Sequence, residues 1–152
     1  MSLDNAIQTS GLYDESTFYP KFEADMLGSS REIIIESPFI TTKRMKLLYP
    51  MFDRLIRRGI KVFILTRDPR EHSEGYKEQS EAEIQRFERL GVQVFICTGN
   101  HHRKLAILDK KILWEGSLNI LSQIKSREIM RRIDSEETAG EMYEFLKLGR
   151  FI

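Results

Sequence analysis

The sequence lacks several features that would place it in a specialised class of protein. It contains 1 cysteine, Cys97, so an intramolecular disulfide cannot form. This cysteine lies in the apolar run 92–97, where we predict a small buried side chain. No apolar run is long enough to cross a bilayer, and the first residues lack the pattern of a signal peptide. These absences favour a cytoplasmic protein without a membrane partner.

A large charge of one sign is also missing. The formal net charge is +1 over 152 residues, which argues against a protein that coats DNA, so any basic surface must be local. Hydrophobic residues make up 41% and charged residues 31%, the composition of an ordinary globular domain. We therefore predict a single domain over residues 15–152, preceded by a flexible arm over residues 1–14.

Alternating apolar runs and amphipathic stretches predict an α/β fold. Short apolar runs at residues 32–36, 61–66 and 92–97 predict three buried strands. The stretches before and between them have helical periodicity and end at glycines, which are Gly28, Gly59 and Gly91. Because parallel strands need long crossover connections, this order predicts a parallel sheet with helices packed on it.

The C-terminal half has a shorter spacing between its apolar runs. Residues 104–108 and 111–114 flank Asp109-Lys110, which predicts a β-hairpin with a two-residue turn. A further strand is expected over residues 127–133. Ser135 is expected to cap a last helix whose apolar residues face the core, and these residues are Ala139, Met142 and Phe145.

The hairpin carries the most informative pattern in the sequence. His102 is followed by Lys104, Asp109 and then Gly116-Ser117-Leu118-Asn119, which gives the spacing H-x-K-x4-D-x6-G-S-x-N. Several residues at fixed spacing are far more specific than a lone glycine motif. The pattern resembles the HKD motif of the phospholipase D superfamily. This resemblance implies an α/β fold with a mixed, largely parallel sheet flanked by helices, of the size of one phospholipase D-like half unit.

The residues of this pattern suit attack on a phosphodiester. Negative oxygens shield the phosphorus, so a catalyst must supply a nucleophile, positive charge and a proton for the leaving group. Neutral His102 can attack phosphorus, and Lys104, on the same side of the strand, can hold the nonbridging oxygens. Asn119 and Ser117 are predicted to donate hydrogen bonds to the same oxygens, with no need for a metal or other cofactor.

Residues beside these catalytic candidates are expected to help bind substrate. Arg103 is predicted to contact a phosphate because it flanks the motif, and the pair Lys110-Lys111 is predicted to do the same. Gly116 is predicted to allow a close approach of the backbone. His101 is expected to point away from the site because side chains alternate along a strand.

Carboxylates are expected in supporting roles. A nucleophilic histidine works best when its second ring nitrogen donates to a carboxylate. Glu128 is the predicted partner of His102, with Asp134 as the alternative, and the resemblance supports a carboxylate near the former position. Asp109 lies at the predicted turn, where aspartate stabilises the backbone, and it is assigned a structural role.

The motif occurs once in the chain, which implies a shared active site. By the resemblance, one histidine attacks and a second protonates the leaving oxygen, so two chains must combine as a homodimer, with His102 of each near the two-fold axis. A compact chain with one motif resembles the nuclease branch of the superfamily, so nucleic acid is the predicted substrate. A phospholipid or other small phosphodiester is one alternative. Binding of nucleic acid within a larger helicase or restriction system is another.

Other conspicuous residues are given ordinary roles. His72 lies in a polar loop and is predicted to be solvated. Two groups of arginines are predicted to be solvated as well, namely Arg54, Arg57 and Arg58, and Arg127, Arg131 and Arg132. Trp114 is predicted to be a core residue rather than a stacking platform for a base.

Overall fold

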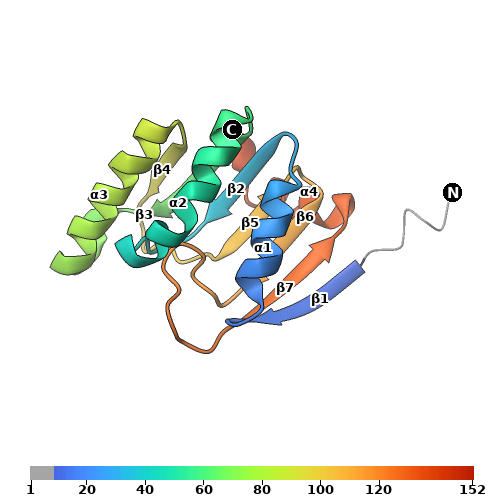
Figure 1. The fold of residues 1–152 in the computed structure, drawn as a ribbon, viewed down its shortest axis with the longest axis horizontal. Coiled ribbons are helices and arrows are strands. Elements are labelled where there is room, and N and C mark those ends of the chain that lie inside the picture. Colours follow the sequence, from blue (N-terminus) through green and yellow to red (C-terminus); the bar gives the residue numbers. More distant parts are fainter. Residues whose placement is uncertain (1–8) are drawn as a thin grey trace, which may run out of the picture.

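A seven-stranded mixed sheet forms the centre of the computed structural model, which describes residues 9–152 (Figure 1). In spatial order the strands are β1 (Thr9–Asp14), β7 (Ile129–Asp134), β6 (Ile112–Gly116), β5 (Leu105–Leu108), β2 (Glu32–Glu36), β3 (Lys61–Arg67) and β4 (Gln93–Cys97). β2, β3 and β4 run parallel to one another. The remaining pairings in the described sheet are antiparallel.

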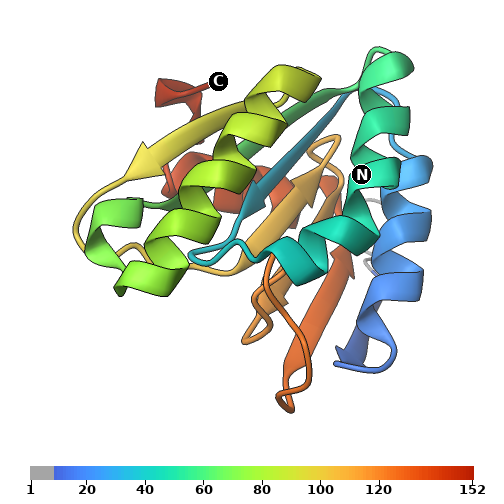
Figure 2. The same ribbon diagram turned by 60° about the vertical axis from the view of Figure 1, so that its left-hand side comes forward.

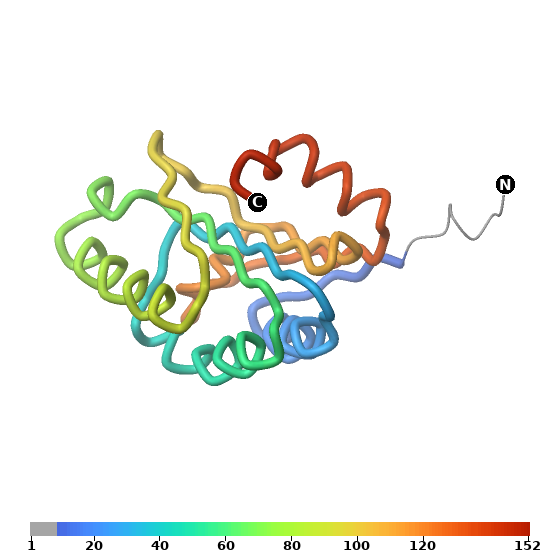
Figure 3. The backbone as a smooth tube through the Cα atoms, turned by 90° about the horizontal axis from the view of Figure 1, so that it is seen from above, coloured from blue at the N-terminus to red at the C-terminus, as the bar shows by residue number. Residues whose placement is uncertain are grey.

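Helices cover both faces of this sheet. Helices α1 (Phe18–Leu27), α2 (Thr42–Arg57) and α3 (Glu74–Leu90) lie on one face, and α4 (Glu136–Phe145) lies on the other (Figure 3). Figure 2 shows α1 beside α2, with α3 in front of the parallel strands. Short 3-10 helices cover Pro69–Glu71 and Leu148–Arg150. None of the helices in residues 9–152 is long and apolar enough to span a membrane.

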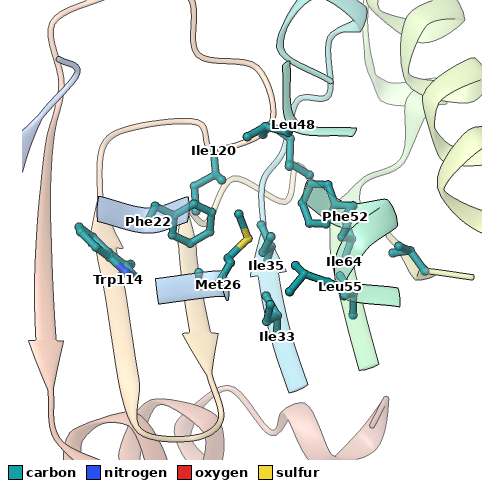
Figure 4. Packing of buried hydrophobic residues seen from close by; sticks show 14 of the residues in the cluster. Phe22, Met26, Ile33, Ile35, Leu48, Phe52, Leu55, Ile64, Trp114 and Ile120 are labelled. Atoms are coloured by element: carbon teal, nitrogen blue, oxygen red, sulfur yellow. The ribbon is translucent and has the colours of Figure 1, made fainter. Parts of the chain in front are cut away.

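Alternation along the central strands separates two hydrophobic cores. Ile33 and Ile35 of β2 face the larger core under α1, α2 and α3, whereas Ile34 faces the smaller core under α4. The central strands are therefore buried on both faces, which explains why their sequences are almost entirely apolar. Figure 4 shows the larger core, in which Phe22 and Met26 of α1 lie over the sheet.

Trp114 is a core residue, as the sequence predicts. Its ring is fully buried and makes edge-on contacts with Tyr13 and Phe18, with ring centroids 4.9 and 5.0 Å apart. Its Nε1–H donates to Asp25 Oδ2 at 2.9 Å, and Arg132 donates to the same oxygen at 2.7 Å. Arg132 is thus paired with a buried carboxylate, and the prediction that it is solvated is wrong.

Local sequence explains where several helices begin and end. The hydroxyls of Thr41 and Ser135 accept hydrogen bonds from the N–H groups of Arg44 and Thr138, which caps α2 and α4. Gly91 ends α3 with a φ of 112°, in the left-handed region that favours glycine.

The structure also corrects several sequence predictions. The mixed α/β sheet is present, but only β2, β3 and β4 are parallel to one another, and the other four pairings of the described sheet are antiparallel. Residues 9–14 form β1 against β7 rather than a flexible arm, while residues 1–8 lie outside the described residues. The predicted turn at Asp109-Lys110 is present, closed by a hydrogen bond of 2.9 Å from the Lys111 N–H to the Leu108 carbonyl oxygen, but Lys111 is an additional residue before Ile112 pairs with Leu108. Phe145 is 80% exposed because Leu146 takes the core position at the end of α4.

Candidate active site

The motif residues divide between the two ends of the β5–β6 hairpin. His102 and Lys104 lie just before β5, Asn119 follows β6 and Glu128 precedes β7. These three strands are antiparallel neighbours, so the start of β5, the end of β6 and the start of β7 meet at one edge of the sheet. We call this the site edge. Asp109 lies at the opposite end, in the turn between β5 and β6.

His102 and Lys104 are in direct contact at the site edge. Lys104 Nζ lies 2.8 Å from His102 Nδ1 and donates to the His102 carbonyl oxygen at 3.0 Å. When the lysine is charged, Nδ1 must be the acceptor, which leaves the ring proton on Nε2. The contact agrees with the expectation that these two side chains share one side of the chain.

The surroundings of His102 favour its neutral form. Desolvation, followed by the positive charges of Lys104 and Arg67, holds the pKa of His102 below its usual value. Desolvation also lowers the pKa of Lys104, although the charge of Glu128 opposes this effect. A neutral imidazole has a free lone pair at physiological pH, which a nucleophile requires.

His101 and Arg103 turn to the opposite side, toward Glu36 at the end of β2. His101 Nε2 lies 2.6 Å from Glu36 Oε1, a close polar contact without hydrogen-bond alignment, and Arg103 Nε donates to the same oxygen at 3.2 Å. The carboxylate of Glu36 is fully buried. Arg103 therefore makes a structural contact through Nε, and its contact with a phosphate stays a prediction.

Glu71 and Arg67 hold the segment that leads to His102. Glu71 accepts hydrogen bonds from the backbone N–H groups of Gly99 and Asn100 at 2.9 and 3.1 Å. Arg67 donates to Asn100 Oδ1 at 2.9 Å. The φ angles of Gly99 and Asn100 are 85° and 57°, in the left-handed region where glycine and asparagine are the favoured residues. Polar contacts, rather than strand pairing, thus position this segment.

Asn119 and Ser117 follow β6, and the polar atoms of their side chains differ in the hydrogen bonds that they make. Asn119 Oδ1 is buried and has no hydrogen-bond partner within residues 9–152. A buried polar atom without a partner is costly, so such atoms are rare outside functional sites. The Ser117 hydroxyl accepts a hydrogen bond from the Ile129 N–H at 3.0 Å, which joins β6 to β7. No hydrogen bond within residues 9–152 engages the Asn119 side-chain amide, so its N–H groups, rather than the Ser117 hydroxyl, remain to donate to a phosphate oxygen.

Glu128 lies at the site edge, where it interacts with neighbouring hydroxyl groups. The polar side chains of Ser117 and Ser126, followed by the charge of Lys104, hold the pKa of Glu128 below its usual value. His102 Nδ1 faces Lys104, and no hydrogen bond in the described part of the chain joins it to Glu128. The role of Glu128 as the carboxylate that orients His102 stays a prediction.

Gly116 is required by the packing of β6 against β7. A Cβ atom at this position would lie 2.2 Å from the Ile129 carbonyl oxygen and 2.9 Å from Met130 Cα. Any side chain would therefore push the two strands apart at the site edge. The close backbone approach that the sequence predicts at Gly116 is made to β7, and a contact with substrate stays a prediction.

Asp109 has the contacts of a structural residue. Its Oδ1 accepts hydrogen bonds from the N–H groups of Arg31 and Glu32 at 2.8 and 2.9 Å, and its Oδ2 accepts one from the Ser30 N–H at 2.8 Å. Burial alone would raise the pKa of Asp109, but these backbone hydrogen bonds hold it below its usual value. The hairpin turn is thereby anchored to the start of β2.

Other residues that the sequence places near the site lie at this turn end instead. Lys110 and Lys111 belong to the turn, and Lys110 Nζ lies 4.3 Å from the centre of the Tyr143 ring. Asp134 ends β7, which has 6 residues and spans roughly 17 Å. Strand pairing carries these side chains away from His102. Asp134 is therefore too distant to be the alternative carboxylate, and that prediction is wrong, whereas contacts of Lys110 and Lys111 with a phosphate stay a prediction.

Two features near His102 are not predicted by the sequence analysis. The first is Glu36, whose signal was a charged residue at the end of an otherwise apolar buried strand. The second is His72, which is half-buried rather than solvated and stacks on Phe39, with ring centroids 4.9 Å apart. The Phe39 ring centroid lies 6.2 Å from that of His102. An aromatic group therefore borders the candidate nucleophile.

The arrangement can supply a nucleophile and a positive charge to a phosphate. His102 offers the lone pair, Lys104 offers the charge and Asn119 offers an amide at the same edge of the sheet. Across residues 9–152, the side chains of His, Cys, Asp and Glu form no group of three or more that could hold a metal ion.

Comparison with known protein families agrees with this geometry. The family model described as cardiolipin synthase, PLD-like domain, matches residues 24–147, which include the whole motif from His102 to Asn119. No curated protein matches the chain.

Solved structures share the fold. NucT from Helicobacter pylori is 17% identical, with a TM-score of 0.72 over 93% of this chain and 94% of that one. Nuc from Salmonella typhimurium, a phospholipase D family member, is 16% identical, with a TM-score of 0.74 over 93% of each chain. Phosphatidylserine synthase from Haemophilus influenzae is 14% identical, with a TM-score of 0.69 over 95% of this chain and 39% of that one. Because the family model covers most of the sequence and the fold agrees, the chain belongs to the phospholipase D superfamily, as a member of its PLD-like domain family.

Proposed function

We propose that the chain is a phosphodiesterase that cleaves nucleic acid through His102, without a metal cofactor, as a homodimer with a shared active site. The observation that carries this proposal is the 2.8 Å contact between His102 and Lys104, which places a nucleophile beside a charge for the phosphate. A neutral imidazole attacks phosphorus directly, so the reaction needs no metal-activated water.

The proposed reaction has two steps. First, His102 Nε2 attacks phosphorus, and a P–N bond forms while the bond from phosphorus to the leaving oxygen breaks. That oxygen takes a proton from His102 of the partner subunit, which enters this step as an imidazolium and leaves it neutral. Second, the partner's His102 removes a proton from water, whose oxygen attacks phosphorus as the P–N bond breaks. The products are a phosphomonoester and an alcohol, and both imidazoles regain their starting protonation.

The position of the ring proton decides when His102 is reactive. Attack through Nε2 requires the proton on Nδ1, the nitrogen that Lys104 Nζ faces in this structure. A phosphate gives the ammonium an anionic acceptor and draws it away from Nδ1. The Nδ1–H group is then free to donate to a carboxylate, and Glu128, whose charge acts on Lys104, is the proposed acceptor.

An exposed apolar patch beside Lys104 supports the homodimer. The patch consists of Leu12 of β1, Ile129 of β7 and Phe145 of α4, which are 66%, 65% and 80% exposed. These residues and Lys104 line one groove with a volume of about 610 Å³. A contiguous apolar surface is uncommon on a monomer, and a second copy of the chain would cover it next to the site.

The choice of nucleic acid rests on the size of the matching chains. The chain matches NucT and Nuc over nearly the full length of each, whereas it covers 39% of the phosphatidylserine synthase chain. A compact chain with one motif thus corresponds in size to the Nuc proteins. The motif residues could act on any phosphodiester, so the substrate must be tested directly.

Labelled DNA and RNA oligonucleotides in excess EDTA test the proposed chemistry. The wild-type protein should cleave them, and His102→Ala should lose at least about a thousandfold in activity because the nucleophile is gone. An acid quench should trap labelled substrate on the wild-type protein but not on the variant. Thermal unfolding of the variant is the control, since His102 is exposed. Cleavage that requires an added divalent cation, or that survives in His102→Ala, contradicts the proposal.

The dimer is tested by a charge placed in the apolar patch. Phe145→Glu should convert a dimer to a monomer and lower the activity. Leu47→Glu is the matched control and should do neither. Leu47 is also an exposed apolar residue, at 63%, but it lies on α2 outside the patch. Light scattering after gel filtration measures the mass in solution. A fully active monomer would show that the site is not shared.

A phospholipid is the second candidate substrate, and the same groove favours it. The structure has an exposed apolar surface beside Lys104, formed by Leu12, Ile129 and Phe145. Acyl chains would occupy this surface if a second copy does not. Hydrolysis of phospholipid vesicles without hydrolysis of oligonucleotides would favour this candidate. Binding of oligonucleotides without any cleavage would favour a binding module instead.

A further inference from the structure

A second groove extends from the site edge on the side of α3. It has a volume of about 330 Å³, near the lower end of the range for ligand pockets, roughly 300–1,000 Å³. Phe39 and Tyr76 line it on one side, and Asn119 and the segment 122–126 line it on the other. Asn119 belongs to the motif, so this groove is continuous with the candidate active site.

The aromatic side of the groove is built from three stacked or tilted rings. The Phe39 ring stacks on His72 with an interplanar angle of 27°, and its centroid lies 5.4 Å from that of Tyr76. Tyr76 is 44% exposed, and Phe39 is half-buried. Desolvation, followed by the charge of Arg67, holds the pKa of His72 below its usual value, so the stack is uncharged at neutral pH.

This aromatic group lies beside the nucleophile. The ring of Phe39 is perpendicular to that of His102, with centroids 6.2 Å apart. A ligand group in contact with Phe39 or Tyr76 would therefore be separated by only one small chemical group from a phosphorus atom that His102 attacks. A nucleobase on the nucleotide next to the scissile phosphate has this relationship to the phosphorus.

The polar side of the groove suits the edge of a base. Gln123 Nε2 donates to the Ser126 carbonyl oxygen at 2.7 Å, and the Ser126 hydroxyl donates to Gln123 Oε1 at 3.2 Å, which fixes the 122–126 segment. Lys125 in this segment is exposed and lines the groove. Ile124 is the one aliphatic side chain in this lining, so the rings, the exposed Lys125 and the amide of Asn119 suit a base better than an acyl chain.

We propose that Phe39 and Tyr76 form a stacking subsite for a nucleobase next to the scissile phosphate, which makes single-stranded nucleic acid the substrate of this site. The inference rests on the proposed phosphodiesterase function. Bases within a duplex are stacked on their neighbours, so only an unpaired base offers a free face to these rings. Stacking tolerates any base, so the subsite selects single strands without selecting sequence.

Removal of the bases from the substrate tests the subsite. A labelled single-stranded DNA oligonucleotide is compared with the same strand that carries abasic nucleotides at its centre. The ratio of kcat/KM for the two strands should fall about 5- to 100-fold in Phe39→Leu and in Tyr76→Leu, the range expected for loss of one stacked base. Tyr49→Leu is the matched control, since Tyr49 lies next to Arg86 on α3 and does not line the groove. An unchanged ratio in both groove variants overturns the subsite.

Binding separates a failure of the subsite from a failure of the proposed function. Fluorescence anisotropy with the His102→Ala protein measures affinity for the intact strand, the abasic strand and a duplex without any turnover. If the wild-type protein cleaves none of them but intact strands bind more weakly in Phe39→Leu, the phosphodiesterase function fails and the subsite stands. Equal affinity for all three nucleic acids, or no binding of single strands, overturns the subsite whether or not cleavage occurs.

Discussion

The β5–β6 hairpin carries motif residues at both of its ends, and the polar atoms of the two ends are satisfied to different degrees. At the turn, both carboxylate oxygens of Asp109 accept hydrogen bonds from backbone N–H groups. At the site edge, Asn119 Oδ1 has no partner within residues 9–152, and Lys104 contacts His102 itself. A satisfied group stabilises the fold, whereas an unsatisfied group is available to a ligand.

The backbone differs between the same two ends. At the turn, the Asp109 N–H donates to the Glu32 carbonyl oxygen at 2.9 Å, which continues the pairing of β5 with β2. At the site edge, the pairing of β5 with β6 ends with a longer hydrogen bond, 3.4 Å from the Gly116 N–H to the Lys104 carbonyl oxygen, and the segment before Lys104 is held by Glu71 and Glu36. The fixed spacing of the motif therefore includes residues that stabilise the fold and residues that are candidates for catalysis. The contacts of each residue show to which of these two groups it belongs.

Among the substitutions that test this difference between the two ends of the hairpin, Asn119→Ala is expected to have the largest effect. Loss of one amide at the site edge should lower kcat about 100- to 1,000-fold if the amide stabilises charge in the transition state. The free energy of unfolding should change by less than about 1 kcal/mol, because Oδ1 makes no hydrogen bond to lose. Steady-state kinetics and urea unfolding measure the two quantities. A large loss of stability with full activity would make Asn119 a structural residue like Asp109.

The opposite result is expected for Asp109→Ala. Loss of its backbone hydrogen bonds, together with a non-glycine φ of 54°, should lower the free energy of unfolding by about 2 to 3 kcal/mol. The ratio kcat/KM should stay within about threefold in protein that remains folded. Asp109→Asn is the matched control and should lose less stability, since asparagine tolerates this φ and keeps one acceptor oxygen. Loss of activity at unchanged stability would break the comparison.

Glu36 provides an intermediate case, because it is a buried residue with structural contacts at the site edge. Its Oε1 contacts both His101 and Arg103, on either side of His102. Glu36→Gln should therefore displace the nucleophile slightly and lower kcat about tenfold, with little change in KM. Kinetics at saturating and limiting substrate separate these parameters. A change in KM alone would instead place Arg103 in contact with the phosphate, as the sequence predicts.

The sequence predicts the site edge well because the motif and the period of two along strands determine it. The spacing of His102 and Lys104 places them on one side of the chain, and the hairpin brings Asn119 to the same edge. The parallel strands and their helices also follow from apolar runs and glycines. Nearness to the motif along the chain does not place Lys110 and Lys111 at the site edge, because an antiparallel strand carries its turn away from its start.

Other features depend on contacts between distant segments, which a single sequence does not encode in its periodicity. Glu36 precedes Arg103 by 67 positions, and Phe39 meets His72 through a loop that has no repeating pattern. Phe145 has the spacing of a core residue in α4, yet Leu146 takes that place because of how the helix lies on the sheet. Helical periodicity predicts which residues share a face, but the packing angle decides which of them is covered.

The smallest expected effect concerns the pKa of His102 in Lys104→Met. After desolvation, the charge of Lys104 is the next largest cause of the lowered pKa, so its removal favours the imidazolium and raises the pKa. The ring should then lose its neutral form at a higher pH than in the wild-type protein. The imidazole signals of His102 in an NMR titration measure this shift, with Lys125→Met as the control. An unchanged or lower pKa in Lys104→Met would mean that desolvation and the charge of Arg67 keep the ring neutral, and that the site edge owes its reactive histidine to these surroundings rather than to the lysine beside it.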